Sequence, residues 1–309
     1  MSEAKAKSSG AVQTTGHAWD GDIQEFNNPL PNWWLWAFYA TVVFAVIYWV
    51  LYPAWPVGGS YTKGVMNDIT FETADGSEKT THWNTRSLLL KDLQEGKQAR
   101  LSQEYMTKVA DAGYAEILGD AEMMAFARSV AKGLFGDNCA PCHGAGGQGV
   151  VGLFPNLADD DWLWGGRVEE IHDTIANGHL GFMPAFRETF DEKQLDDLAT
   201  YVLSLSGHAV DTASSERGKS IFQTDVGGCY YCHTKAGTGL KSQGAANLTD
   251  QIWTIADVSG AEGIEAKKER VKQVISNGVQ REMPHWGERL SATQIKLLTV
   301  YVHELGGGQ

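Results

Sequence analysis

The sequence contains one five-residue pattern twice, and this pattern limits what the chain can fold around. Cys139-Ala-Pro-Cys142-His143 recurs as Cys229-Tyr-Tyr-Cys232-His233, and the two copies use all four cysteines of the chain. In the attachment pattern for c-type haem, both thiols bond to the haem vinyl groups and the following histidine reaches the iron. We therefore predict two covalently bound haem c groups, attached at Cys139, Cys142, Cys229 and Cys232, with His143 and His233 as axial iron ligands.

Paired cysteines have uses other than haem attachment. A Cys-x-x-Cys pair occurs in thioredoxin-like redox sites and as half of a zinc site, and four cysteines also suffice for two disulfides. None of these uses requires a histidine directly after the second cysteine in both copies. The pattern therefore favours haem.

The similarity between the two copies extends beyond the cysteines. The segment 156–162, with Asn-Leu-Ala-Asp and a tryptophan, matches the segment 247–253, with Asn-Leu-Thr-Asp and a tryptophan. Each copy then continues through an amphipathic stretch to Asn177-Gly178 or Asn277-Gly278, which predicts the end of a helix. A repeat of this length predicts two tandem helical domains, residues 119–207 and 208–309, each wrapped around a cofactor.

Each repeat also contains a methionine followed by proline, Met183-Pro184 and Met283-Pro284. A single methionine is commonly core filler, but two at matched positions in loop-like stretches predict a second axial ligand for each haem. Haem iron with histidine and methionine ligands suits single-electron transfer and leaves no free position for oxygen or peroxide. His179 and His285 lie near these methionines, so ligation by two histidines is the competing interpretation.

A closing helix follows each methionine. Capping-box patterns, Thr189-x-x-Glu192 and Ser291-x-x-Gln294, predict where the two helices begin. In the first copy an apolar face is predicted to pack on the haem domain, and it consists of Leu195, Leu198, Ala199 and Val202.

Two further positions are candidates for supporting the haems. Trp162 and Trp253 could line the haem edge or donate to a propionate, and plain core packing is an equal alternative. Pro155 resembles the cytochrome c proline whose carbonyl orients the ligand histidine. Because the second repeat has Ala246 there, the sequence leaves the support of His233 in doubt.

A single apolar segment precedes the repeats. From Trp33 to Tyr52 there is no charged residue, and a helix of this length spans about 30 Å, the thickness of a bilayer core. Tryptophan and tyrosine residues lie at both ends, where headgroups are expected, and Pro53 ends the helix. The segment 32–55 is therefore predicted to be a transmembrane helix. A buried core helix and a cleaved signal peptide are the alternatives, and acidic residues before the segment argue against the second.

The regions on either side of this helix carry fewer signals. Residues 1–28 read as disordered, and residues 1–31 are predicted to form a cytoplasmic tail. Residues 56–118 are predicted to be a periplasmic tether or packing collar with helical stretches at Ser87 to Leu93 and Gln98 to Val109. Lysines near the membrane are too few to orient the helix. Because thioethers form outside the cytoplasmic membrane, the haem domains are placed in the periplasm.

The charge of the chain limits its partners. The formal net charge of -13 argues against nucleic acid and suits contact with cationic proteins. A solvated acidic surface without a specific partner is the alternative. The sequence thus predicts an all-α protein with one N-terminal transmembrane helix followed by two tandem class I cytochrome c domains.

The order of these segments resembles a known family. The segment 19–34, with Trp-Asp-Gly-Asp-Ile-Gln-Glu and Asn-Pro-Leu-Pro-x-Trp-Trp, precedes one membrane helix and two cytochrome c repeats, the first of which contains Asn-Leu-Ala-Asp-Asp-Asp-Trp-Leu-Trp at 156–164. Taken together, these features look like the di-haem subunit of cbb3-type cytochrome c oxidases, bacterial respiratory oxidases that work at low oxygen. The resemblance covers essentially the whole chain.

The resemblance implies a role in electron transfer. In that family the subunit takes electrons from a soluble or membrane-bound donor cytochrome c and passes them to a mono-haem cytochrome c subunit. They continue to the catalytic haem-copper subunit, which reduces oxygen and pumps protons. By this resemblance the chain is a non-catalytic subunit in the cell inner membrane. It has no catalytic residues of its own, and its axial ligands are His143, Met183, His233 and Met283.

Two other functions compete with this interpretation. A di-haem cytochrome c peroxidase needs one iron with an open or displaceable ligand, which two matched methionines do not favour. A membrane-bound carrier like cytochrome c4, serving another redox complex, would have the same spectra. Only the proteins that purify with the chain would distinguish it from an oxidase subunit.

Overall fold

The computed structural model describes residues 13–65, 68–73 and 75–306. The predicted tail lies partly outside these residues, as do the last three positions of the second predicted domain. The chain divides into two compact units, one up to Leu101 and one from Ser102 onward.

The first unit begins with a β-hairpin in a region predicted to be disordered. Strands β1 (Thr14–Trp19) and β2 (Ile23–Phe26) pair antiparallel. Asp20 and Gly21 between them both have positive φ, 52° and 88°, and Asp22 N–H donates to the Trp19 carbonyl. Two successive positive φ values are typical of the tight turns that join hairpin strands, and Asp-Gly is a favoured sequence for them. The prediction of disorder was therefore wrong for residues 14–26.

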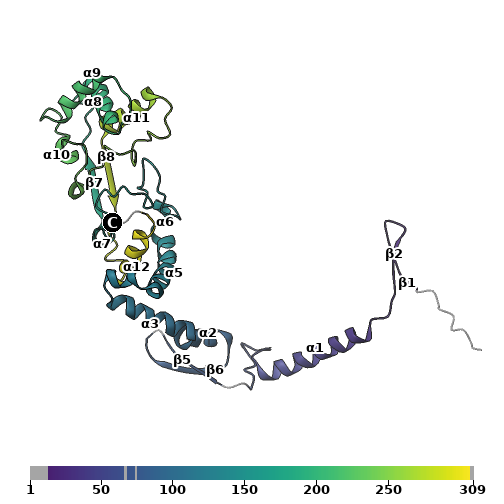
Figure 1. Ribbon diagram of the computed structural model, residues 1–309. Coiled ribbons are helices and arrows are strands. Elements are labelled where there is room, and N and C mark those ends of the chain that lie inside the picture. The colour runs from purple at the N-terminus through teal and green to yellow at the C-terminus, as the bar shows by residue number, and fades with distance from the viewer. Residues whose placement is uncertain (1–12, 66–67, 74, 307–309) are drawn as a thin grey trace, which may run out of the picture. The chain divides into compact units, whose positions relative to one another are not determined.

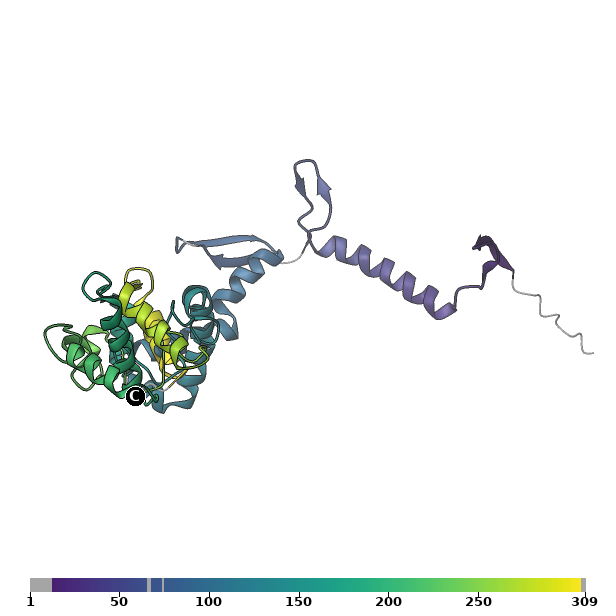
Figure 2. The same cartoon turned by 90° about the horizontal axis from the view of Figure 1, so that it is seen from above.

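Helix α1 (Asn32–Leu51) is a continuous twenty-residue helix, close to the predicted limits (Figures 1 and 2). It is long and apolar enough to cross a membrane, and none of its residues is buried by the rest of the chain. Its side chains are therefore available to lipid along the whole helix.

The rest of the first unit consists of two short hairpins and a helix. Strands β3 (Pro56–Val57) and β4 (Ser60–Tyr61) pair, as do β5 (Asp68–Glu72) and β6 (Glu78–His82). Helix α2 (Thr85–Glu95) packs on β5 and begins at Asn84, whose side chain accepts from Ser87 N–H at 2.9 Å. The predicted helical stretch at Ser87 to Leu93 lies within α2.

Helices α3 (Lys97–Asp111) and α4 (Tyr114–Gly119) precede the two repeats. Val109 and Ile117 are fully buried against Leu297 and Val300 near the end of the chain. Lys296 Nζ donates to the carbonyls of residues 109, 110 and 112, at 3.1, 2.6 and 2.8 Å, and so caps the end of α3. Residues 102–118, the last part of the predicted tether or packing collar, thus pack into the second unit.

Each repeat supplies a long helix, a short helix bearing the cysteine motif, an amphipathic helix, a strand and a closing helix. In the first repeat these are α5 (Ala121–Asn138), α6 (Ala140–His143), α7 (Val168–Asn177), β7 (His179–Met183) and α8 (Glu192–Leu205). In the second they are α9 (Thr212–Phe222), α10 (Tyr230–His233), α11 (Ile264–Asn277), β8 (Val279–Met283) and α12 (Ala292–His303), with a 3-10 turn at Lys241–Gln243.

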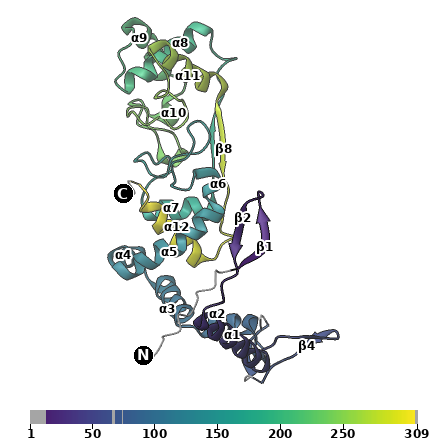
Figure 3. The same cartoon turned by 90° about the vertical axis from the view of Figure 1, so that its right-hand side faces the viewer.

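The repeats exchange their closing helices. Helix α12 of the second repeat packs against α5 and α7 of the first, and α8 of the first repeat packs against α9 and α11 of the second. Figures 1 and 3 show these two groups of helices at opposite ends of the β7 and β8 strands. The repeats therefore form two bundles, but each bundle contains parts of both. The exchanged contacts thus cross the predicted boundary between residues 207 and 208.

Strands β7 and β8 are the crossing point. They pair antiparallel with His179 opposite Met283, Gly181 opposite Arg281, and Met183 opposite Val279. Gly178 and Gly278 end the preceding helices with φ of 68° and 69°. A Cβ on either would lie within 2.5 Å of the other repeat's methionine carbonyl, so only glycine fits where the strands cross.

The two bundles have separate hydrophobic cores. Phe135, Ile171 and Ile175 of the first repeat pack with Ile295, Leu298 and Val302 of α12. The predicted apolar face of α8 is buried, but its partners include Phe222, Val271 and Ile275 of the second repeat. Burial of these aliphatic side chains, each contributing about 1.5–3 kcal/mol, stabilises the exchanged arrangement.

An ion pair with a buried carboxylate joins two helices at one exchanged contact. Asp197 on α8 accepts from Arg217 on α9 through two hydrogen bonds, both of 2.7 Å. The Asp197 side chain is only 5% exposed, whereas that of Arg217 is 47% exposed. Ser214 also donates to Asp197, so the carboxylate is well satisfied by the second repeat.

Two details of the predicted secondary structure need correction. Helix α12 begins with the predicted capping box of Ser291 and Gln294, but α8 uses Asp191 and Gln194 in place of Thr189 and Glu192. The described residues also form four two-stranded sheets, so the fold is mostly helical and not all-α.

Candidate haem sites

Each cysteine motif forms a short helical turn that positions its histidine. His143 is buried, and its Nδ1 donates to the Pro155 carbonyl at 3.0 Å. His233 Nδ1 donates to the Ala246 carbonyl at 2.9 Å. The doubt about His233 was unnecessary, because a backbone carbonyl supplies the support and any residue can provide one.

These hydrogen bonds leave the other ring nitrogen, Nε2, free to bind a metal. Burial lowers the pKa of His143 and His233, although the bonds to the carbonyls oppose this effect. Neutral imidazole with Nδ1 committed to a carbonyl is the form that ligates iron. Burial also raises the pKa of Cys139 and Cys229 to about 11, whereas Cys142 and Cys232 are exposed.

The turn after each motif differs between the repeats. Gly144 follows His143 with φ 79° and ψ 157°, a conformation available to glycine. Thr234 occupies the matched position with φ 62° and ψ 164°. A β-branched residue in this region is strained, and Thr234 Oγ1 compensates in part by accepting from Thr238 N–H at 3.2 Å.

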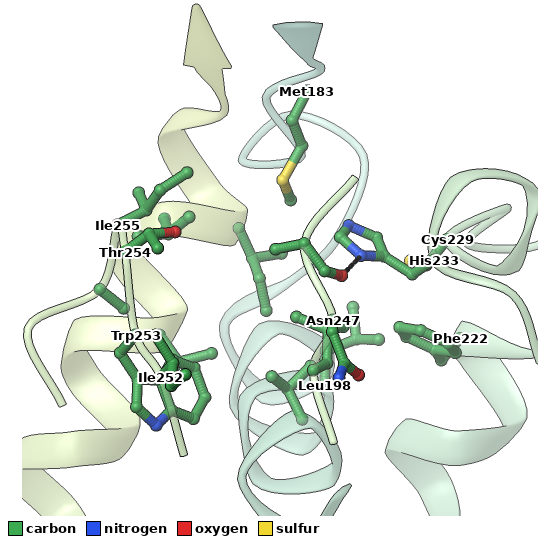
Figure 4. Close-up of a pocket in the computed structure, with 17 residues that line it drawn as sticks. Met183, Leu198, Phe222, Cys229, His233, Asn247, Ile252, Trp253, Thr254 and Ile255 are labelled. Atoms are coloured by element: carbon green, nitrogen blue, oxygen red, sulfur yellow. Dashed lines mark hydrogen bonds between the residues drawn. The ribbon is translucent and has the colours of Figure 1, made fainter. Parts of the chain in front are cut away.

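The second site is an apolar cavity of about 750 Å³, including its open mouth. His233 and Met183 both line it, although they come from different repeats (Figure 4). Leu198 and Val202 of the first repeat complete the lining together with side chains of the second, among them Cys229, Leu248, Trp253, Val271 and Ile275. An apolar cavity with one histidine and one thioether has the donor set and the apolar lining that suit a haem.

Backbone hydrogen bonds fix where each methionine segment docks. Phe186 and Arg187, just after Met183, donate to the carbonyls of Ile275 and Ser276 at the end of α11, both at 3.1 Å. The matched residues after Met283 do the same at the end of α7, since Trp286 N–H donates to the Ile175 carbonyl at 3.0 Å. Met183 therefore lies in the bundle of His233, and the Met283 segment lies in the bundle of His143.

The first site contains a buried donor without a partner. Trp162 packs against the core that includes Phe135 and Ile171, and its Nε1 forms no hydrogen bond within the described part of the chain. A buried indole N–H normally finds an acceptor. A haem propionate would be such an acceptor, so this residue fits the presence of the group.

The competing histidines are engaged elsewhere. His179 stacks on Trp164 with ring centroids 4.0 Å apart, and its Nε2 lies 3.0 Å from the Thr174 hydroxyl. His285 is exposed, with its Nε2 3.8 Å from a Glu288 carboxylate oxygen. Neither lines the cavity that contains His233.

The two sites differ at one position that has an ionisable side chain in the first repeat only. Asp161 lies where the second repeat has Ile252, a residue that lines the second cavity. Burial raises the pKa of Asp161 to about 6, and the nearby carboxylates of Asp250 and Asp159 add to the shift. Its Oδ2 is buried without a partner among the described residues. No sequence motif points to this position, although the alignment of the repeats shows the difference.

Known families match both parts of the chain. Residues 11–59 match the family described as the N-terminal domain of cytochrome oxidase-cbb3, FixP. Residues 128–202 and 213–302 each match the family described as cytochrome C oxidase, cbb3-type, subunit III. The second match therefore falls on both repeats.

Whole-length relatives agree with these matches. A cbb3-type cytochrome c oxidase subunit FixP of Azorhizobium caulinodans is 43% identical over 99% of this chain and 97% of its own length. The corresponding subunits named CcoP of Azospirillum brasilense and Cereibacter sphaeroides are 37% and 35% identical, over 100% and 97% of both chains. The chain therefore belongs to the subunit III family of cbb3-type cytochrome c oxidases, and it is an electron-transfer subunit of such an oxidase.

Proposed function

We propose that this chain carries two haem c groups and uses them to accept electrons from a donor cytochrome c. It passes them towards the mono-haem subunit and the catalytic oxygen-reducing subunit of the oxidase. The observation that carries this proposal is the placement of one motif histidine and one methionine segment in each of two bundles. Haem c supplies a reversible one-electron couple when bound.

The pairing of ligands follows the exchanged fold. We assign His233 and Met183 to the haem attached at Cys229 and Cys232. We assign His143 and Met283 to the haem attached at Cys139 and Cys142. The four ligands in this proposal are the ones predicted from the sequence. Each methionine, however, is assigned to the haem attached to the other repeat.

The chain's own residues prepare these sites for electron transfer. The carbonyls of Pro155 and Ala246 hold the two histidine rings in one orientation, with Nε2 left to bind the iron when haem is attached. A thioether ligand from Met183 or Met283 would take the position on the iron that oxygen or peroxide needs. These features support a carrier without catalytic residues more than they support a di-haem peroxidase.

The membrane helix sets the location. We propose that α1 spans the cell inner membrane with the N-terminus in the cytoplasm and the haem bundles in the periplasm. Thioether attachment outside the cytoplasmic membrane supports this orientation. The net charge of -13 suits transient docking of a cationic donor cytochrome, because electrostatic attraction speeds association.

Mild detergent extraction of the tagged chain from its native membranes tests the function. The extract is analysed for c-type and b-type haem, and oxygen uptake is measured with reduced cytochrome c. Copurification of b-type haem with oxidase activity is expected. A matched preparation carrying Cys229→Ala and Cys232→Ala should lose half of the c-type haem contributed by this chain.

Other results would change the assignment. If the chain emerges alone, with c-type haem and no oxygen uptake, a free-standing membrane carrier becomes the better account. Peroxide reduction by the isolated chain, together with loss of the methionine-to-iron absorption band at one haem, would support a peroxidase.

A further inference from the structure

Arg281 occupies the centre of the ribbon formed by β7 and β8. It pairs with Gly181, and this is the middle of the five residue pairs between the strands. Because strand residues alternate faces, Arg281 shares its face with Met183 and Met283 and not with the exposed Leu180, Phe182, Gln280 and Glu282. Two strand residues, about 7 Å, separate the central pair from each methionine.

The side chain of Arg281 reaches a loop that touches both sites. Its Nη2 donates to the Gly152 carbonyl, and Gly152 N–H donates to the Thr254 carbonyl at 3.1 Å. Thr254 lines the cavity of His233. On the other side, the Phe154 ring lies 6.4 Å from the ring of His143. The guanidinium is therefore held between the two sites.

The charge of Arg281 is not neutralised by the protein around it. The residue is half-buried, and within the described ranges it forms no ion pair. The matched position of the first repeat is Gly181, which places no side chain opposite the arginine. The two matched positions thus contain one positive charge between them, that of Arg281.

We propose that the positive charge of Arg281 acts on both haems and raises the reduction potential of each. The proposal rests on the two haem sites proposed above. Reduction adds one electron to an iron and removes one unit of positive charge from its site. A fixed positive charge nearby favours the reduced form, and partial burial limits how far solvent weakens the effect. Arginine stays charged at every pH at which the protein is folded.

Potentiometric titration of the full-length chain in detergent, followed by c-type haem absorbance, tests this proposal. Arg281→Gln keeps a hydrogen-bond donor for Gly152 but removes the charge. We expect both titration midpoints to move to lower potential, so that the ratio of reduced to oxidised haem at a fixed potential falls several-fold. Arg281→Lys keeps the charge and should restore most of the parent midpoints.

Arg270→Gln is the matched control. Arg270 is exposed on α11 and loses the same charge on substitution. Its midpoints should equal those of the parent, because solvent screens a surface charge. If Arg281 only holds the loop in place, Arg281→Gln should lower thermal stability and leave both midpoints unchanged. That outcome would overturn the proposal.

Haem analysis separates this test from that of the proposed function. Haem content and the methionine-to-iron absorption band are measured first on the parent chain. Two haems with methionine ligation and unchanged midpoints in Arg281→Gln would refute the role of Arg281 alone. A shift confined to one haem would refute the sharing. Fewer than two haems in the parent would refute the proposed function and this inference together.

Discussion

Met183 lines the same cavity as His233, although the two residues belong to different repeats. Strand β7 carries Met183 out of the bundle that contains α7, and the following segment docks on the end of α11. The equivalent connection through β8 brings the Met283 segment to α7. The strands that exchange the closing helices therefore also exchange the methionines.

Chains with a single haem attachment test the crossed pairing. With Cys139→Ala and Cys142→Ala in place, only the haem at Cys229 and Cys232 remains. In this background Met183→Leu should abolish the methionine-to-iron absorption band, because the thioether is removed from the cavity of His233. Met283→Leu in the same background is the control and should leave the band intact. The opposite result would show that each methionine serves its own repeat.

The ion pair of Asp197 and Arg217 should contribute to the exchanged contact between α8 and α9. Arg217→Gln leaves a buried carboxylate without its charged partner, and we expect a loss of about 2 kcal/mol in unfolding free energy at pH 7. Denaturant unfolding of the detergent-solubilised chain measures it. Lys193→Gln is the matched control, since this exposed lysine lies 3.5 Å from the same carboxylate and should cost less than about 0.5 kcal/mol.

The effect of Arg217→Gln should also depend on pH. Burial by itself raises the pKa of Asp197, but the hydrogen bonds from Arg217 and Ser214 outweigh it and hold the pKa below 3.8. A carboxyl with a depressed folded pKa contributes stability above its unfolded pKa and loses it as pH falls. The difference between parent and variant should therefore be smaller at pH 4 than at pH 7. A constant difference would argue that the arginine acts through packing alone.

Asp161 should reduce stability at neutral pH. Its folded pKa of about 6 exceeds the usual 3.8, so the folded state holds a proton that the unfolded state loses between these values. Stability attributable to this group falls as pH rises from about 4 to 6, and the cost is complete above 6. Asp161→Asn should raise the unfolding free energy by about 1–2 kcal/mol at pH 7.5 and have no effect at pH 4. The exposed neighbour Asp160, changed to Asn, provides the control.

Thr234 should be a site of stored backbone strain. Thr234→Gly relieves a conformation that costs about 1–3 kcal/mol but loses the hydrogen bond from Thr238, so a net gain of about 1 kcal/mol is expected. Thr234→Ala keeps the strain and loses the bond, and it should be less stable than the parent. Gly144→Thr, at the matched position, should destabilise the first site. Thermal unfolding of the haem-loaded chain measures all three, and a stabilised Thr234→Ala would contradict this account.

The sequence by itself determined the chemistry of the chain and its local elements. The attachment motifs predict haem binding because two thiols and a histidine lie close together in the sequence. The Asn-Gly pairs end α7 and α11 as expected. The apolar run from Trp33 to Tyr52 needs only length and composition to predict α1. All four proposed axial ligands could be named in this way.

Only the tertiary structure decided which parts belong together. An apolar face on α8 specifies that the helix is buried but not against which repeat, and duplicated repeats offer two nearly equivalent partners. Contacts between distant residues make the choice, such as Asp197 with Arg217 and the methionine segments on the ends of α7 and α11. The place of Arg281 between the two sites depends on strand register, which no spacing along the chain reveals.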